Sequence, residues 1–240
     1  MGKIALMLAM FLCLPWVATP SSASEQVPVT QNIKQQLLGT PVYIQIFKEE
    51  RTLELYGKMG NEFRLLGAYR ICNFSGGLGP KRREGDFKSP EGFYSVDIRH
   101  LKPNSRFYRA INIGYPNAYD RAQGYSGNYL MIHGECKSIG CYAMTNAYMD
   151  EIFTYVDAAL RNGQVKVDIA IYPFRMTDTN LQRHRMSSYY TFWRGLQPGY
   201  RYFSEKHLPP TVTVANGQYV FNPAIIGTQN ISEYAFTETK

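Results

Sequence analysis

Short apolar runs, continuous or alternating with polar residues, recur through the first two thirds of the chain, and turn residues separate them. Runs of this length that are rich in branched and aromatic residues are typical of β-strands. Between Asn146 and Leu160 the pattern differs, because apolar residues recur at helical spacing after Thr145, a residue suited to an N-cap. The pattern therefore predicts a mostly β fold with one main helix. The predicted strands cover residues 42–47, 52–56, 63–72, 129–132 and 165–172.

The character of the chain changes after the last of these strands. Residues 177–194 are polar and are predicted to be helical. Asn216-Gly217 lies between two alternating apolar runs, which is a strong signal of a β-hairpin. We therefore interpret residues 176–240 as an accessory segment packed on a core domain of residues 41–175, with disordered last residues. Residues 24–40, ahead of the core domain, are interpreted as a polar linker.

The N-terminus carries the pattern of an export signal. Lys3 precedes an apolar stretch from Ile4 to Val17, and the small residues Ser21-Ser22-Ala23 follow. These features predict a secretory signal peptide over residues 1–23 that is cleaved after Ala23. The apolar stretch is shorter than the ~20 residues that a spanning helix needs, so we expect an exported chain without a stable membrane span.

Basic residues outnumber acidic ones by 26 to 19, which gives a formal net charge of +7. Removal of the predicted signal peptide takes away one lysine and no acidic residue, which leaves one positive charge fewer. This balance is consistent with an acidic or polyanionic surface as partner. No arginine-rich helix or zinc-finger spacing accompanies the charge, so nucleic acid is not expected as a partner.

The candidate chemistry lies in a run that begins with His133-Gly134 and ends with Gly140-Cys141. A thiol attacks carbonyl groups as thiolate and needs a nearby base at neutral pH, and His133, at the end of a predicted strand, is suited to be that base. Cys141 lies shortly before the N-terminus of the predicted helix, whose partial positive charge favours a thiolate. Gly140 allows close approach of a substrate, and the amides of Cys141 and Tyr142 are candidates for an oxyanion hole.

The local sequence leaves other uses of these residues open. His133, Cys136 and Cys141 also fit three ligands of a zinc site, with Cys72 as a fourth. After removal of the signal peptide, which contains Cys13, three cysteines remain, so at least one thiol stays unpaired within the chain. Either Cys72 and Cys136 pair or lie close together, leaving Cys141 free, or Cys136 bonds to Cys141 and silences it.

Two loop regions are expected to flank the thiol. Residues 75–85 are glycine-rich and basic, and we expect a mobile loop whose cations meet substrate carboxylates or form a solvated face. Residues 106–129 hold many Tyr, Asn and Gly residues and are expected to form a lid or to line the substrate site. Asn117 and Arg121 in this region, together with Ser138, are the candidates for substrate contacts.

A second motif favours the nucleophile interpretation. The segment Gly85-Asp86-Phe87-Lys88-Ser89-Pro90-Glu91-Gly92-Phe93-Tyr94 resembles the G-x-x-x-[TS]-P-x-G-x-[FY] element of the L,D-transpeptidase catalytic domain, also called the YkuD-like domain. The resemblance covers roughly residues 41–175 and includes His133-Gly134 and the S-x-G-C pattern of residues 138–141. It implies the β-sandwich-like fold of that family. Within the family, the shortened His-to-Cys loop and the extra C-terminal segment are most similar to the YafK-like branch.

The resemblance implies that Cys141 is the acyl-accepting nucleophile and His133 is the general base and acid. It implies an oxyanion hole formed by the backbone of Gly140 and Tyr142, and it requires neither a cofactor nor a metal. Most members read S-H-G-C-[IV]-R, whereas Ile139 and Ala143 replace the second His and the Arg here. These departures favour hydrolysis over the family's usual crosslinking.

The function implied by the resemblance is that of a periplasmic cysteine enzyme acting on the stem peptides of peptidoglycan. It forms a thioester with a diaminopimelate-containing stem and hydrolyses the diaminopimelate-to-lysine link that attaches the major outer-membrane lipoprotein, a further expected partner. One alternative is an L,D-transpeptidase that makes 3-3 crosslinks or attaches lipoprotein. Another is a non-catalytic cell-wall binding module with a zinc or disulfide site.

Overall fold

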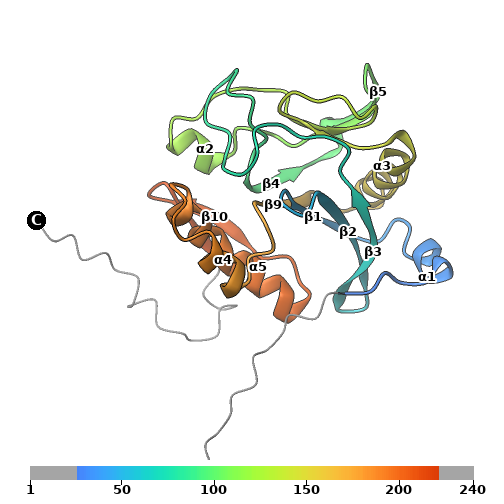
Figure 1. Cartoon of the computed structure of the whole chain (residues 1–240). Helices are drawn as coiled ribbons and strands as arrows, with labels where there is room; N and C mark the ends of the chain where they lie inside the picture. The colour runs from blue at the N-terminus through green and yellow to red at the C-terminus, as the bar shows by residue number, and fades with distance from the viewer. Residues whose placement is uncertain (1–25, 222–240) are drawn as a thin grey trace, which may run out of the picture.

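The computed structural model describes residues 26–221 of the chain, so the predicted signal peptide and the last residues lie outside it. The described residues form eleven strands in three sheets and five α-helices (Figure 1), which confirms the mostly β fold class. The largest sheet consists of β1 (Val42–Phe47), β2 (Thr52–Met59), β3 (Glu62–Arg70), β4 (Gly92–Val96) and β9 (Val167–Tyr172). Its strand order is β3-β2-β1-β9-β4, with β1 and β9 parallel.

A second sheet carries the candidate chemistry. It consists of β5 (Leu101–Ser105), β6 (Tyr108–Asn112), β7 (Met131–His133) and β8 (Tyr142–Ala143), in that order. β7 and β8 are parallel neighbours. The prediction that a short apolar strand ends at His133 is confirmed, and Cys141 directly precedes β8.

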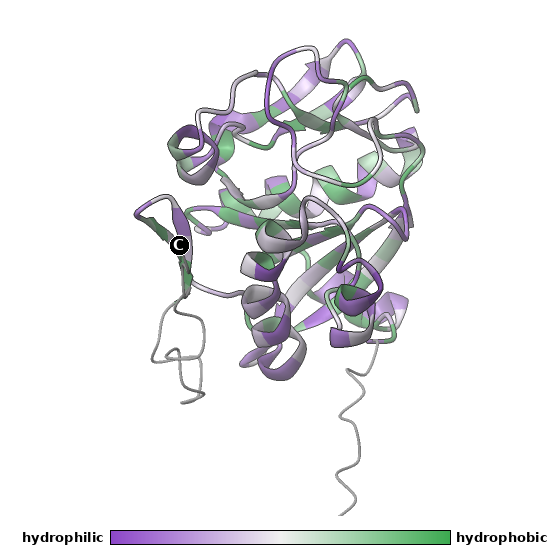
Figure 2. Ribbon diagram, turned by 60° about the vertical axis from the view of Figure 1, so that its left-hand side comes forward, coloured by the Kyte–Doolittle hydropathy of each residue, from purple (hydrophilic) through white to green (hydrophobic). Residues whose placement is uncertain are grey.

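Strand β1 lies between two apolar cores, and for this reason all six of its residues are buried. Ile44 and Ile46 belong to the core beneath helix α3 (Asn146–Arg161), whereas Tyr43 and Phe47 belong to the core beneath helix α5 (Tyr190–Lys206). Successive strand residues point to opposite faces, so a strand covered on both sides is continuously apolar. Figure 2 shows this arrangement as largely apolar strands between helices with hydrophilic outer turns.

Helix α3 agrees closely with its prediction. The side chain of Thr145 accepts a hydrogen bond from the amide of Tyr148 at 3.2 Å, which confirms Thr145 as the N-cap. Met149, Ile152 and Val156 are fully buried on the face that packs against the sheets. The shorter helices are α1 (Gln31–Gln36), α2 (Ala118–Ala122), α4 (Asp178–Arg183) and the 3-10 helix η1 (Ile98–His100).

The prediction for the C-terminal segment was right about the hairpin and wrong about the helix. Strands β10 (Val212–Ala215) and β11 (Gln218–Phe221) pair through Asn216 and Gly217, whose φ values of 50° and 71° fit the predicted tight turn. The predicted helix over 177–194 is instead split into α4 and the later, longer α5. Local propensity disfavours α5, which contains Pro198, but burial of its apolar face against the large sheet stabilises it.

Within residues 26–221, no helix combines the length and the apolar character needed to cross a bilayer.

Candidate active site

Strand pairing places the two candidate catalytic residues on one face of the second sheet. His133 is paired with Ala143, and Ile132 with Tyr142, in the parallel β7–β8 ladder. Extending this register by one residue sets Cys141 opposite Met131, two positions along from His133. Side chains two positions apart on neighbouring strands share a face, with Cα atoms roughly 8 Å apart by ordinary strand spacing. An imidazole and a thiol can meet across that distance.

The imidazole of His133 is buried, with only 2% of the residue exposed, and its orientation is set by the backbone. Its Nδ1 lies 2.6 Å from the carbonyl oxygen of Gly134. Since a carbonyl can only accept, Nδ1 carries the proton and Nε2 is left as the basic nitrogen. Burial lowers the pKa of His133, against smaller opposing effects from Gly134 and Glu135. The ring is therefore neutral at pH 7 and able to take a proton. The ring of Phe107 packs against it at 4.9 Å between centroids.

The thiol of Cys141 is free and half-buried. Its Sγ donates to the carbonyl oxygen of Tyr129 at 3.7 Å. Burial raises the pKa of Cys141, while a hydrogen bond from the Met131 backbone and the charge of Lys81 lower it in part. Thiol and imidazole are thus both neutral at rest.

The other two cysteines of residues 26–221 form a disulfide. Cys72, just after β3, is bonded to Cys136 in the loop between β7 and β8, with Cα atoms 5.1 Å apart. Of the two pairings that the sequence left open, the one that leaves Cys141 free is present. The zinc interpretation loses two of its four ligands to this bond, and residues 26–221 contain no cluster of three or more His, Cys, Asp or Glu side chains suited to a metal.

The loop between the base and the thiol has an uncommon backbone. Glu135 and Cys136 have φ values of 67° and 51°, in the left-handed region that non-glycine residues rarely occupy. Gly134 precedes them because a Cβ there would lie 2.6 Å from Oδ1 of Asn146. That same oxygen accepts the Glu135 amide at 2.8 Å. The disulfide and Asn146 together hold this strained loop in place.

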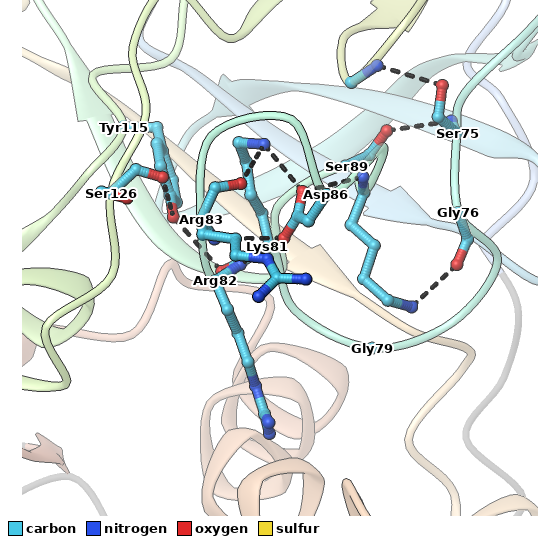
Figure 3. A network of polar contacts seen from close by, with 12 residues as sticks. Ser75, Gly76, Gly79, Lys81, Arg82, Arg83, Asp86, Ser89, Tyr115 and Ser126 are labelled. Carbon is cyan, nitrogen blue, oxygen red and sulfur yellow. Dashed lines mark hydrogen bonds and ion pairs between the residues drawn. The ribbon is translucent and has the colours of Figure 1, made fainter.

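Three serine side chains hold the backbone around Cys141. The hydroxyls of Ser138 and Ser89 donate to the carbonyl of Cys141 at 2.8 and 3.3 Å. Ser75 accepts the amide of Gly140 at 3.0 Å and binds Ser89 through its own amide at 3.2 Å, a contact visible in Figure 3. Ser138, predicted to contact substrate, therefore supports the nucleophile's backbone. Ser75 and Ser89 were not predicted as site residues, although Ser89 belongs to the S-P-x-G motif.

The backbone donors expected to form an oxyanion hole differ in availability. The Gly140 amide already donates to Ser75, which corrects the expectation that it faces a substrate. Tyr142 is fully buried in β8, and its hydroxyl donates to the carbonyl of Pro90 at 2.5 Å. No hydrogen bond joins the Cys141 amide to another residue within the described part of the chain. The Cys141 amide therefore stays a candidate donor for an oxyanion.

The basic loop next to the thiol is closed by internal contacts (Figure 3). Lys81, with a side chain only 7% exposed, binds Asp86 at 2.8 Å and the carbonyl of Arg83 at 3.0 Å. Burial raises the pKa of Asp86, but hydrogen bonds from the Arg82 backbone and from Lys81 outweigh it and lower the value to about 2. Lys81 is therefore held inside the loop, where its charge reaches the thiol, and does not extend into solvent.

Lys81→Met is expected to slow alkylation of Cys141 by iodoacetamide about two- to fivefold at pH 7.5, because loss of a nearby positive charge raises the thiol pKa further. In the unchanged protein the rate should climb with pH into the alkaline range, since the resting thiol is neutral, and the variant's curve should lie at higher pH. Mass spectrometry of the alkylated protein over a pH series measures both. Lys88→Met, which loses contacts to the Gly76 and Leu78 carbonyls instead, is the control. If the alkylation rate of Lys81→Met followed the same pH curve as that of the unchanged protein, the charge of Lys81 would not act on the pKa of Cys141.

Asn117 and Arg121, predicted to contact substrate, are not brought to the thiol. Asn117 caps α2 and donates to the Phe93 carbonyl at 2.8 Å and to the Tyr219 hydroxyl at 2.9 Å, so the fold uses its side chain. Arg121 donates to the carbonyl of Pro116. Both line a cavity of about 570 Å³ between β4 and the C-terminal hairpin, and neither Cys141 nor His133 contributes to that cavity.

Large apolar side chains lie exposed beside the nucleophile. Ile139, Tyr129 and Phe87 are 76%, 69% and 64% exposed. The carbonyl of Tyr129 accepts a hydrogen bond from the Cys141 thiol. Phe87 directly precedes Lys88, and a Cβ added to Gly140 would lie 3.6 Å from the carbonyl oxygen of Lys88. We call Phe87, Tyr129 and Ile139 the apolar rim.

A free thiol and a neutral imidazole on one face of a parallel strand pair, in a mostly β fold, are the elements of a cysteine acyl-transfer enzyme. Residues 41–171, which are 131 of the 240 residues, match the family model of the L,D-transpeptidase catalytic domain, YkuD. The chain therefore belongs to the L,D-transpeptidase catalytic domain family, which confirms the resemblance stated above. It is an enzyme that acts on peptidoglycan.

Among its relatives, YafK of Escherichia coli strain K12, a protein that carries the name of an L,D-transpeptidase, is 58% identical over 246 aligned positions covering 100% of both chains. Among solved structures, the helical cell shape determining protein Pgp2 of Campylobacter jejuni is similar at a TM-score of 0.45 and 20% identity, covering 73% of each chain. Bd1075 of Bdellovibrio bacteriovorus is similar at 0.40 and 16%, covering 79% of this chain and 80% of its own.

Proposed function

We propose that this protein is a periplasmic cysteine hydrolase that detaches the major outer-membrane lipoprotein from peptidoglycan by cleaving the diaminopimelate-to-lysine link. The free Cys141 thiol, on the face of the β7–β8 pair that also carries the neutral, oriented imidazole of His133, supports the proposal. The predicted signal peptide supports export, and the Cys72–Cys136 disulfide fits an oxidising compartment.

In the first half of the reaction, Nε2 of His133 takes the thiol proton as Sγ of Cys141 bonds to the diaminopimelate carbonyl carbon. The Cys141 amide donates to the oxygen that becomes negative. The carbon–nitrogen bond then breaks, the protonated His133 gives its proton to the leaving lysine amine, and a thioester remains. In the second half, His133 removes a proton from water, which attacks the thioester. The carbon–sulfur bond then breaks, protonated His133 returns its proton to the sulfur, and the stem leaves as a carboxylic acid that ionises in water.

Two features of the site support hydrolysis over crosslinking. Ala143 lies opposite His133 in the strand register, where most family members have an arginine, so no cation orients an anionic acceptor there. Ile139 replaces the second family histidine and is 76% exposed. The apolar rim to which Ile139 belongs offers a polypeptide, such as the lipoprotein on the leaving side, a surface to pack against.

The test uses sacculi that carry bound lipoprotein, incubated with the unchanged protein or with Cys141→Ala, followed by mass spectrometry of released protein and muropeptides. Release of lipoprotein by the unchanged protein alone is the expected result. New 3-3 crosslinks in its place would make the enzyme a transpeptidase. Identical products from both proteins would overturn the catalytic assignment and favour the cell-wall binding module.

A further inference from the structure

A fully buried ion pair lies between the large sheet and the accessory segment. Nζ of Lys48, the residue after β1, is 2.8 Å from Oε1 of Glu91, the residue before β4, and neither side chain has any exposed surface. Removing two charges from water is costly, and a buried pair rarely stabilises a fold more than apolar residues of the same size. A role in fixing geometry is therefore the better explanation for its presence.

Lys48 uses all three of its ammonium donors within this site. Besides Glu91, it donates to the carbonyl of Gly79 at 3.0 Å and to the carbonyl of Ser89 at 3.1 Å. Gly79 and Ser89 belong to the loop that lies beside the thiol. The lysine thus ties both arms of that loop to the end of β1.

Glu91 connects the same site to helix α5. Its Oε2 accepts Nε1–H of Trp193 at 2.8 Å, while its Oε1 also accepts the amide of Gly79 at 2.7 Å. Trp193 is 2% exposed and packs in the core beneath α5. The accessory segment therefore supplies the indole donor that completes the hydrogen bonds of a buried carboxylate.

The contacts continue from the ion pair to the nucleophile. Ser89, whose carbonyl binds Lys48, directs its hydroxyl to the carbonyl of Cys141 at 3.3 Å and accepts the amide of Ser75. Ser75 in turn holds the Gly140 amide. An unbroken series of hydrogen bonds thus leads from α5 through Glu91, Lys48 and Ser89 to the backbone of Cys141.

We propose that Trp193 acts as a positioning residue through the Lys48–Glu91 pair, so that the accessory segment sets the geometry of Ser89 and the reactivity of Cys141. The proposal rests on the proposed function for its substrate, although its first readout does not need that substrate. Under this proposal, helix α5 of the accessory segment influences the reactivity of Cys141 although it does not itself carry a reacting group.

The experiment replaces Trp193 with phenylalanine, which keeps an apolar ring in the core and removes the donor to Glu91 together with part of the indole volume. Alkylation of Cys141 by iodoacetamide and kcat for lipoprotein release are expected to fall about tenfold, as for loss of a hydrogen bond to a charged group, with KM unchanged. Tyr200→Phe is the matched control, because Tyr200 lies buried on the same helix face and the charged groups that act on it are Arg175, Glu54 and Glu50, not Glu91. In the Tyr200→Phe variant, iodoacetamide should alkylate Cys141 at the rate of the unchanged protein.

A double variant separates positioning from general loosening of the fold. Ser89→Ala removes the last contact before Cys141, so adding Trp193→Phe to it should slow alkylation little further. The proposal would be overturned if the double variant lost alkylation rate by the product of the two single-variant losses. An unchanged rate in Trp193→Phe, or an equal loss in Tyr200→Phe, would overturn it as well. If the unchanged protein releases no lipoprotein, the proposed function fails while these alkylation rates still decide the role of Trp193.

Discussion

Replacement of His133 by glutamine is expected to slow lipoprotein release by about 10²- to 10⁴-fold. Glutamine keeps a donor for the Gly134 carbonyl, which Nδ1 of His133 binds at 2.6 Å, but it has no basic nitrogen to accept the thiol proton. Because burial raises the pKa of the Cys141 thiol, little thiolate forms at neutral pH without a base. The loss should therefore appear in kcat at pH 7, with KM close to its original value.

His100→Gln is the matched control for this prediction. His100 pairs with Asp97 at 2.8 Å through Nδ1, and its side chain is partly exposed. Turnover of this variant should equal that of the unchanged protein. Activity of His133→Gln within a few-fold of normal would exclude His133 as the general base, and a similar loss in both variants would point to a general effect of removing a histidine.

Removal of the disulfide is expected to have the largest effect on stability. The double variant Cys72→Ser with Cys136→Ser should lose about 4 kcal/mol of unfolding free energy, because the bond closes a long loop in the unfolded chain. The two cysteines are 64 residues apart in the sequence. Turnover should fall as well, since the bond holds Cys136 and Glu135 in left-handed backbone conformations between the base and the thiol. Urea unfolding gives the free energy, and lipoprotein release gives the activity.

Reduction by dithiothreitol provides the control within the same pair of proteins. It should lower the unfolding midpoint of the unchanged protein toward that of the double variant and leave the double variant where it is. Equal midpoints for the oxidised protein and the double variant would show that the bond does not stabilise the fold. A double variant with unchanged stability and full activity would show that the disulfide is not needed to hold the loop between His133 and Cys141.

Local patterns in the sequence predicted much of what lies near the nucleophile. The strand that ends at His133, the helix that Thr145 caps and the turn at Asn216-Gly217 follow from side-chain period, capping and backbone preference over a few residues. The signature residues Cys141 and His133 were recognisable because they lie eight positions apart. Each of these features depends on neighbours in the chain.

Features that depend on distant residues escaped prediction. Helix α5 contains Pro198, and its burial against β1 and β9 forms it in spite of that residue. Asn117 looked available for substrate, yet it is used by Phe93 and by Tyr219, which is 102 residues away. Ser75 carries no local signal at all, because its partner Gly140 is 65 residues further along.

The sequence by itself determined the strand pattern, the family motif, His133 and the three cysteines that remain after the predicted signal peptide, and these carry the proposed chemistry. Only the tertiary structure decided which cysteine stays free, since Cys72–Cys136 and Cys136–Cys141 bridges were equally available until β3 and the loop after β7 came together. The same holds for the link from Trp193 to the thiol. Period and propensity act between residues a few positions apart, whereas the packing of two cores on one sheet sets which distant side chains meet.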